Sequence, residues 1–366
     1  MSLPRRLFWS AGSAIVLALG GGCSPAYVTQ AVTGQLEIAG VERPVDDVLN
    51  DARTTPELRR SLAAAKQVLR YAHEELGLPD NGSYRQFAAL DRPYVVWNVF
   101  VAPEFSLELH TWCFPVAGCV GYRGYFDEKD AQQFAAGKAA QGSDVAVRGA
   151  LAYSTLGFFR DPLLSTVMHL PPTDVAGLVF HELAHQRIYV AGDTAFNESF
   201  ATLVEQEGTI RWLEVNANSE GLCAYLVGLQ REREVYALLE QARARLKAVY
   251  ASKQTEEARR KAKESELTQL RERYRQLRAQ WHEPPYFDGW FRQPLNNAAL
   301  AAIAAYRSYV GQLRVILDSE GGDLERFYRR VERLARLTAA ERAAVLGEIT
   351  DPTDRQPGAG CPGGPG

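Results

Sequence analysis

The sequence is short of histidine, of cysteine and of charge of one sign. Its 366 residues include six histidines and five cysteines, and 41 Lys and Arg nearly balance 44 Asp and Glu, for a net charge of −3. Without a basic excess the composition does not support binding to a nucleic-acid backbone, so we expect no nucleic-acid partner. The chain also lacks internal repeats. An apolar share of 46% is typical of a soluble globular protein with one large or two modest domains.

A long apolar run is missing as well. The run from Leu7 to Leu19 is too short for a comfortable membrane span, and it follows two arginines and precedes three glycines and Cys23. This order predicts an export signal over residues 1–22. A cysteine directly after small residues resembles a lipobox, so we predict that Cys23 is acylated, with simple cleavage nearby or a retained anchor as alternatives. The mature protein would then be lipid-anchored in the bacterial cell envelope, in the outer membrane facing the periplasm.

Two of the few cysteines lie close together in a turn-rich segment. Cys113 and Cys119 are six residues apart, with Pro115 and Gly118 between them. An exported protein meets an oxidising compartment, which favours a local disulfide bond. A metal site is the alternative, but no further Cys or His lies at the spacing of a zinc knuckle.

The apolar pattern predicts an α+β fold that is mainly helical and contains a small sheet. Apolar residues recur at helical spacing from Pro56 to Gly77 and in two stretches of the C-terminal part, Asn296 to Leu313 and Leu324 to Leu346. Short runs of β-branched and aromatic residues predict strands. These strands are Tyr94 to Phe100, Cys119 to Phe126 and Ala150 to Phe159, and the last could be an edge with which an extended peptide pairs.

The few histidines are concentrated in the motif His181-Glu182-Leu183-Ala184-His185. Thr173 can cap a helix that starts at Asp174 and ends near Gly192. On a helix, His181 and His185 project from the same face one turn apart, so both imidazoles can reach one tetrahedral zinc ion. Glu182 can then act as general base toward a metal-bound water. The alternative is a structural pair of histidines on a core-facing helix.

Two histidines leave such a zinc site short of a protein ligand. A second helix, starting at Asp193-Thr194 and running antiparallel to the first, would bring Glu198 level with His185 at 1.5 Å per residue. We therefore predict Glu198 as the third ligand. Glu205 and Thr202 lie on the same face as Glu198, and either could bond the far nitrogen of a ligating histidine, with Glu205 preferred as a carboxylate.

These residues resemble the gluzincin class of zinc peptidases, in which His-Glu-x-x-His is followed by a helix carrying Asn-Glu. The whole chain resembles the family of predicted bacterial aminopeptidase lipoproteins. The resemblance implies that His181, His185 and Glu198 bind Zn²⁺ and that Glu182 is the base. The interval from His185 to Glu198 is shorter than in familiar gluzincins, and the motif Gly-x-Met-Glu-Asn of well-studied aminopeptidases is absent. The stretches that carry the family resemblance are Tyr27 to Leu36, Trp112 to Phe126, Ala152 to Pro162, the zinc segment and Pro294 to Ala298.

On this basis the chain divides into a signal peptide and four further parts. We expect a zincin-like catalytic region over 23–230, a charged helical hairpin or coiled coil over 231–282, a C-terminal helical region over 283–350 that completes the domain, and a disordered tail over 351–366. The hairpin is expected to be a solvated structural arm, and binding of a protein partner is the alternative.

The predicted function is zinc-dependent hydrolysis of peptide bonds, as an aminopeptidase acting on a peptide substrate. An oxyanion in the transition state needs a further donor, for which Tyr153 and Tyr306 are candidates, although either could be a core tyrosine. Two other functions stay open: a zinc hydrolase of cell-wall amides, and a non-catalytic metal-binding scaffold of the envelope.

Overall fold

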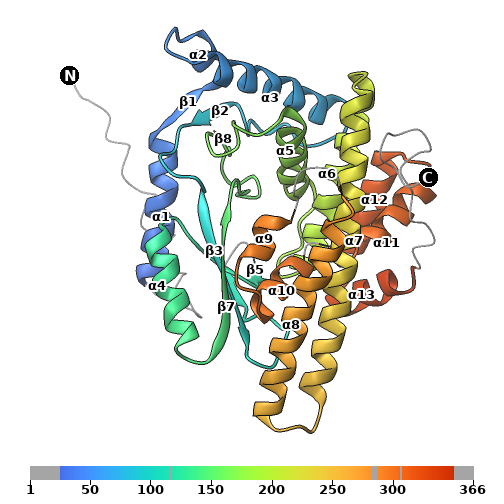
Figure 1. The fold of residues 1–366 in the computed structure, drawn as a ribbon. Helices are drawn as coiled ribbons and strands as arrows, with labels where there is room; N and C mark the ends of the chain where they lie inside the picture. The colour runs from blue at the N-terminus through green and yellow to red at the C-terminus, as the bar shows by residue number, and fades with distance from the viewer. Residues whose placement is uncertain (1–24, 115–117, 282–286, 306, 350–366) are drawn as a thin grey trace.

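The computed structural model describes residues 25–114, 118–281, 287–305 and 307–349. The described chain is mainly helical with three small sheets, in agreement with the predicted α+β class (Figure 1). The signal peptide, Cys23, Tyr306 and the tail lie outside the described residues. Within the described ranges, every helix is too short or too polar to span a lipid bilayer.

The central antiparallel sheet has the strand order β6-β3-β7. Strand β3 (Val96–Pro103) pairs along its full length with β7 (Ser143–Ala150) and more briefly with β6 (Arg123–Tyr125). Its side chains alternate between two layers, which explains why β3 is apolar except at Asn98, which lines a cleft. Trp97 and Val99 pack on helix α4 (Glu128–Ala139), whereas Phe100 and Ala102 pack on α10 (Asn297–Ala305).

Two smaller sheets flank the central one. Strand β1 (Glu42–Pro44) pairs antiparallel with β2 (Gln86–Ala88), which pairs in parallel with β8 (Leu163–Leu164). Strands β4 (Trp112–Phe114) and β5 (Gly118–Val120) form a hairpin. The predicted disulfide bond between Cys113 and Cys119 joins these two strands.

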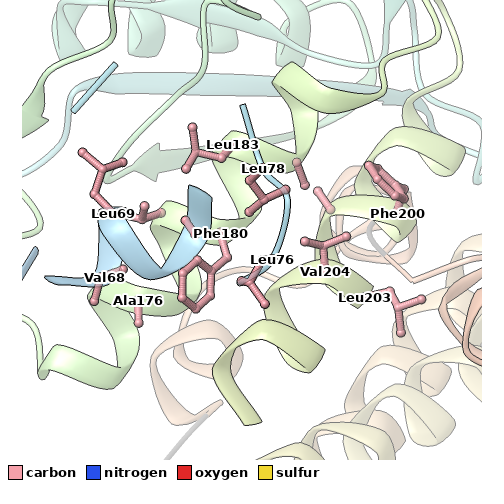
Figure 2. Packing of buried hydrophobic residues seen from close by; sticks show 14 of the residues in the cluster. Val68, Leu69, Leu76, Leu78, Ala176, Phe180, Leu183, Phe200, Leu203 and Val204 are labelled. Carbon is pink, nitrogen blue, oxygen red and sulfur yellow. The ribbon is translucent and has the colours of Figure 1, made fainter. Parts of the chain in front are cut away.

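The main hydrophobic core lies among helices on the other side of the molecule. Phe180 and Leu183 of α5 (Pro172–Arg187) meet Phe200 and Leu203 of α6 (Thr194–Val215), and all four are fully buried (Figure 2). Helix α3 (Pro56–Glu74) covers one side of this helix pair, and three C-terminal helices cover the other. The remaining helices of this half are α2 (Val45–Asn50), α11 (Val310–Ser319), α12 (Leu324–Ala335) and α13 (Ala339–Gly347).

A long helical hairpin lies beside this core. Helix α7 (Ser219–Ala251) begins earlier than the predicted boundary at residue 231 and packs on α8 (Glu256–Arg278) through apolar residues of both helices (Figure 1). The short helix α9 (Asp288–Arg292) adds Phe291 to the same cluster.

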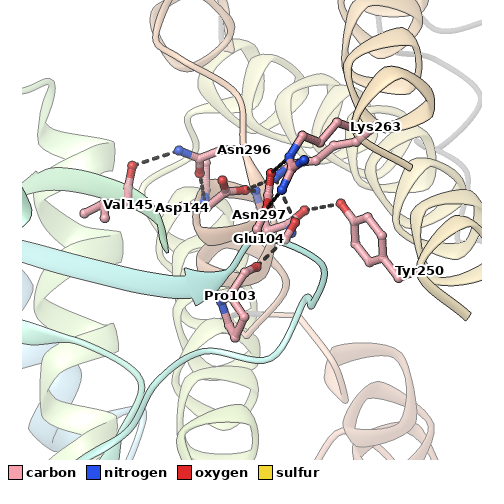
Figure 3. Close-up of polar contacts among 10 residues, drawn as sticks. Pro103, Glu104, Asp144, Val145, Tyr250, Lys263, Asn296 and Asn297 are labelled. Atoms are coloured by element: carbon pink, nitrogen blue, oxygen red, sulfur yellow. Dashed lines mark hydrogen bonds and ion pairs between the residues drawn. The ribbon is translucent and has the colours of Figure 1, made fainter. Parts of the chain in front are cut away.

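The hairpin is fixed to the central sheet and is not a free arm. Buried Lys263 on α8 pairs with Asp144 at 2.6 Å and donates to the Glu104 carbonyl at 2.9 Å, while Asp144 also accepts the Asn297 backbone N–H (Figure 3). The Asn297 side chain in turn accepts the Tyr250 hydroxyl. The polar middle of the hairpin is therefore partly an internal contact, and partner binding stays a prediction.

Several local predictions were wrong. The helix predicted to end near Gly192 ends at Arg187, and the predicted strand from Cys119 to Phe126 is divided into β5 and β6. Helix α5 begins at Pro172 without a side-chain cap, because proline at its first position needs no hydrogen bond, and Thr173 lies inside the helix. Strand β7 ends at Ala150, and the segment up to Phe159 is a loop in which Leu156 and Gly157 have positive φ, so it offers no edge for a peptide. Each of the two predicted C-terminal helical stretches is divided into two helices.

Candidate metal centre

Helices α5 and α6 place the predicted ligands on facing surfaces. Helix α5 buries its apolar side in the core, which directs His181, Glu182 and His185 away from it. The two helices approach closely because Gly208 has no side chain: a Cβ there would lie 2.9 Å from the ring of Phe180. The linker between them turns at Gly192, whose φ is +84°. The structure thus forms the antiparallel pair that the sequence predicted.

The three predicted ligands converge. Their ligand atoms all lie within 4.8 Å of one another, and His181, His185 and Glu198 are the one such group of three among the described residues. Oε2 of Glu198 lies 3.4 Å from Nε2 of His181 and 3.8 Å from Nε2 of His185. Two imidazole nitrogens and one carboxylate oxygen around a common point can hold a metal ion.

The environment of Glu198 fits a bound cation. Its Oε2 atom is buried and has no hydrogen-bond partner among the described residues, which is costly for a charged oxygen unless a cation neutralises it. Burial would raise the pKa of Glu198, but His185 and His181 lower it below its usual value. Burial lowers the pKa of His185 to about 4, so its imidazole is neutral, as a metal ligand must be.

The far side of His181 is held by Glu205. Oε2 of Glu205 lies 2.9 Å from Nδ1 of His181, which leaves Nε2 facing Glu198. This is the orienting contact predicted from the sequence. Burial would lower the pKa of His181, but the carboxylates of Glu198 and Glu205 raise it well above its usual value. Thr202 is buried on the same helix, and its predicted contact to a histidine stays a prediction.

Glu182 has the pKa expected of a general base. Burial is the main reason that the pKa of Glu182 rises to about 7; His181 opposes the shift, while the carboxylates of Glu198 and Asp161 reinforce it. A carboxyl group with a pKa near 7 can both accept and return a proton at neutral pH.

A cleft of about 870 Å³ opens onto these residues. His181, Glu182, His185 and Glu198 form part of its wall. The opposite walls come from helix α1 (Pro25–Gly40), from the central sheet and from the loop between residues 152 and 160. Four of the five stretches that carry the family resemblance, the zinc segment among them, therefore surround the cleft.

A family model described as "Putative aminopeptidase" matches residues 26–346. The chain belongs to this family. The match covers most of the chain, including every wall of the cleft. The comparison with curated proteins gave no match. The comparison with solved structures gave none either, so the zincin-like architecture stays a prediction.

In this aminopeptidase-family member, several contacts fix the linker between α5 and α6, which directly precedes the helix that carries Glu198. The side-chain amide of Asn197 donates to the Val190 carbonyl and accepts the Val190 N–H, both at 2.8 Å. Gly118 of the disulfide hairpin packs against the backbone of Gly192 so closely that a Cβ would overlap it. Neither contact was predicted: the bonds of Asn197 depend on the conformation of the linker, and the approach of Gly118 depends on tertiary packing.

The C-terminal helix α13 also contributes to the position of Glu198. Asp193 caps α6 by accepting the N–H of Phe196 at 3.1 Å. Its other oxygen accepts two hydrogen bonds from Arg342, at 2.9 and 2.8 Å. Arg342 is only 2% exposed, so a buried charge pair fixes the start of the helix that carries Glu198.

Four tyrosines line the cleft, namely Tyr27, Tyr122, Tyr153 and Tyr189. Sequence reasoning named only Tyr153 of these as a candidate donor. The Tyr153 hydroxyl lines the cleft but donates to Gln35 of α1. Tyr122 and Tyr189 also line the cleft, and burial together with the Glu198 carboxylate raises the pKa of each. Their hydroxyls therefore stay protonated and can donate hydrogen bonds.

A further tyrosine, Tyr84, does not line the cleft and is buried at a φ of +64°. Burial and the carboxyl groups of Glu182 and Asp161 raise its pKa well above the usual value. Its hydroxyl has no hydrogen-bond partner among the described residues. No sequence motif marks Tyr84, Tyr122 or Tyr189, because only the fold brings them to the site.

Proposed function

We propose that the protein is a zinc-dependent peptidase that hydrolyses peptide bonds as an aminopeptidase. The observation that carries this proposal is the convergence of His181, His185 and Glu198 in a cleft wall that also contains Glu182. Membership of the family described as putative aminopeptidase supports the reaction class. The set of two imidazoles and one carboxylate supports zinc as the metal, because zinc favours nitrogen ligands and uses three protein ligands in catalytic sites.

The residues divide the chemistry among them. Zinc, when bound, would polarise the scissile carbonyl and lower the pKa of its water to roughly 7. Glu182 would take one proton from the attacking water and deliver it to the leaving amine, so that one water is consumed and a carboxylate and an amine are released. Glu205 holds His181 in the orientation that binding requires. Tyr122 and Tyr189 are the donors that we assign to the oxyanion.

We also propose that the protein acts in the bacterial envelope, anchored through a lipid on Cys23 to the outer membrane. The disulfide between Cys113 and Cys119 supports an oxidising compartment. Mass spectrometry of the N-terminal peptide from membrane-extracted protein tests the anchor. An acylated Cys23 supports it, and an unmodified cysteine or a different N-terminus contradicts it.

Elemental analysis of purified protein tests the metal centre. We expect about one zinc per chain in wild type, a much weakened content in Glu198→Ala, and an unchanged content in Glu214→Ala, which alters an exposed residue of the same helix. Glu182→Gln should keep zinc but lose peptide hydrolysis. Wild-type protein prepared under zinc-replete conditions without bound metal would overturn the proposal. A Glu182→Gln protein with undiminished hydrolysis would overturn the role of Glu182.

A further inference from the structure

The cleft wall opposite the metal centre is apolar and open to solvent. Val32 and Leu36, one turn apart on α1, are 53% and 65% exposed, and Phe159 on the facing loop is 60% exposed. All three line the cleft. A stable soluble protein exposes grouped large apolar side chains where another molecule covers them. These three residues are called the apolar wall below.

Two of the three residues of the apolar wall, Val32 and Leu36, belong to a fixed element, helix α1. Gln30 of α1 accepts the Phe126 N–H at 3.1 Å and donates to the Gly124 carbonyl at 3.3 Å. Gly34 lies so close to the ring of Phe126 that a Cβ would overlap it. Helix α1 is therefore seated on β6 by side-chain bonds and by close packing, and its apolar face is held toward the cleft.

The same cleft contains one carboxylate that the proposed chemistry does not use. Its acidic lining residues are Glu182, Glu198 and Glu42, and the first two belong to the metal centre. The side chain of Glu42 makes no hydrogen bond or ion pair with any residue of the described ranges, although its backbone pairs with Ala88 in the sheet. Partial burial and the nearby Asp161 carboxyl group raise its pKa. A cation beside Glu42 would relieve the repulsion between these two carboxyl groups.

Resting on the proposed function, we infer that the cleft takes the free amino end of a peptide whose first residues are apolar. The Glu42 carboxylate pairs with the terminal ammonium, and the apolar wall of Val32, Leu36 and Phe159 covers the first side chains. The peptide then runs from Glu42 toward the metal centre, so cleavage falls at a fixed short distance from the free amino end. An acetylated peptide has no terminal ammonium to pair with Glu42. A peptide whose first residues are polar leaves the apolar wall exposed to solvent.

The test compares four peptides on the full-length protein. Two peptides have the same apolar sequence, and the other two have the same polar sequence. Each pair consists of one peptide with a free amino end and one with an acetylated amino end. Binding is measured on zinc-loaded Glu182→Gln protein by fluorescence anisotropy, and hydrolysis on zinc-loaded wild type by mass spectrometry of the products. We expect the free apolar peptide to bind most tightly. Glu42→Gln should weaken its affinity about tenfold or more and leave the acetylated peptide unaffected, because a charge-assisted bond is lost.

Matched variants separate the two halves of the inference. Asp47→Asn removes an exposed carboxylate close in sequence but outside the cleft lining and should change nothing. Leu36→Ser should weaken apolar but not polar peptides, whereas Val215→Ser, which alters a 72% exposed residue outside the cleft lining, should weaken neither.

Several results would overturn the inference. Equal affinity for free and acetylated peptides, or an equal effect of Glu42→Gln on both, removes the role of Glu42. If Leu36→Ser abolishes binding to phosphatidylglycerol vesicles and keeps peptide affinity, the apolar wall is a membrane contact and not a peptide site. Hydrolysis of internal bonds of acetylated peptides would contradict only this inference, because the protein would still hydrolyse peptide bonds. Stoichiometric zinc with no peptide hydrolysed or bound would remove both.

Discussion

The strongest structural prediction concerns Arg342, which lies far from the cleft but fixes the helix that carries Glu198. Its guanidinium binds Asp193 through two nitrogens and donates through the third to the carbonyls of Leu334 and Leu337 at 3.0 and 2.9 Å. Arg342→Met keeps much of the apolar stem and removes every one of these bonds. The Asp193 carboxylate, 18% exposed, would then be left without its cation.

Breaking a buried pair by removing one partner costs about 3–5 kcal/mol. Water can reach the partly exposed Asp193, so we expect the lower end, about 3 kcal/mol, in the free energy of unfolding. Unpaired helix-end carbonyls add to this cost, while the retained stem offsets a part of it. Such a loss is a large fraction of the 5–15 kcal/mol that is usual for a domain, yet it leaves the protein folded at room temperature.

Urea unfolding, followed by circular dichroism on metal-free protein, measures this change. Arg336→Met is the matched control, because Arg336 is exposed and has no side-chain bond within the described ranges. We expect the control to stay within about 0.5 kcal/mol of wild type. Zinc affinity, measured by chelator competition, should fall in Arg342→Met because the start of α6 is released. A loss of stability below about 1 kcal/mol would refute the reasoning that a buried pair holds α6 in place.

Three further changes test other contacts of the site. Glu205→Gln should weaken zinc binding about 10- to 100-fold in chelator competition, because the histidine ligand loses its charged orienting partner. Gly118→Ala should lower thermal stability and zinc affinity together, because its methyl group would displace the linker between α5 and α6. Burial opposes a low pKa for Glu207, but ion pairs with Arg314 and Arg211 lower this pKa below its usual value. The ionised Glu207 therefore stabilises the folded protein at neutral pH, and this contribution is lost as the pH falls through the lowered pKa. Glu207→Gln should therefore flatten the acid side of the stability–pH curve measured by urea unfolding.

Each of these changes has a control within the chain. Glu214→Gln alters an exposed glutamate of the same helix and should leave zinc affinity unchanged. Gly142→Ala alters a glycine of similar positive φ with open space around it, so it carries the backbone strain without the clash. If Gly142→Ala matches Gly118→Ala in zinc affinity, the linker contact is not the cause. Unchanged zinc affinity in Glu205→Gln, or an unchanged acid limb in Glu207→Gln, would contradict the corresponding prediction.

The metal centre could be predicted from sequence because its geometry is almost entirely local. His181 and His185 are related by helical spacing alone, and Glu198 follows from one further helix and a turn at Gly192. Glu205 was predicted in the same way, since a carboxylate two turns beyond Glu198 shares its face. Rise per residue and helix periodicity are enough for all of these inferences.

The rest of the cleft could not be predicted, because it depends on contacts between distant segments. Tyr122 and Glu42 have no local signal that distinguishes them from other tyrosines and glutamates. The loop after Ala150 reads as a strand because its aromatic residues are typical of strands, but Phe158 and Phe159 are exposed in a turn. Lys263 lies in a charged stretch of the sequence, where side chains are usually solvent-exposed, so its burial could not be predicted.

The seating of α1 has a consequence for the order of folding. Its hydrogen bonds to β6 and to the loop at Tyr153 join residues 94 to 118 positions apart. Contacts of such long sequence separation require the intervening chain to be placed first, whereas α5 and α6 are neighbours joined by a short linker. Helix α1 is thus synthesised before α5 and α6 but packs into place after them. The metal centre can form while the side of the cleft that α1 lines is still open.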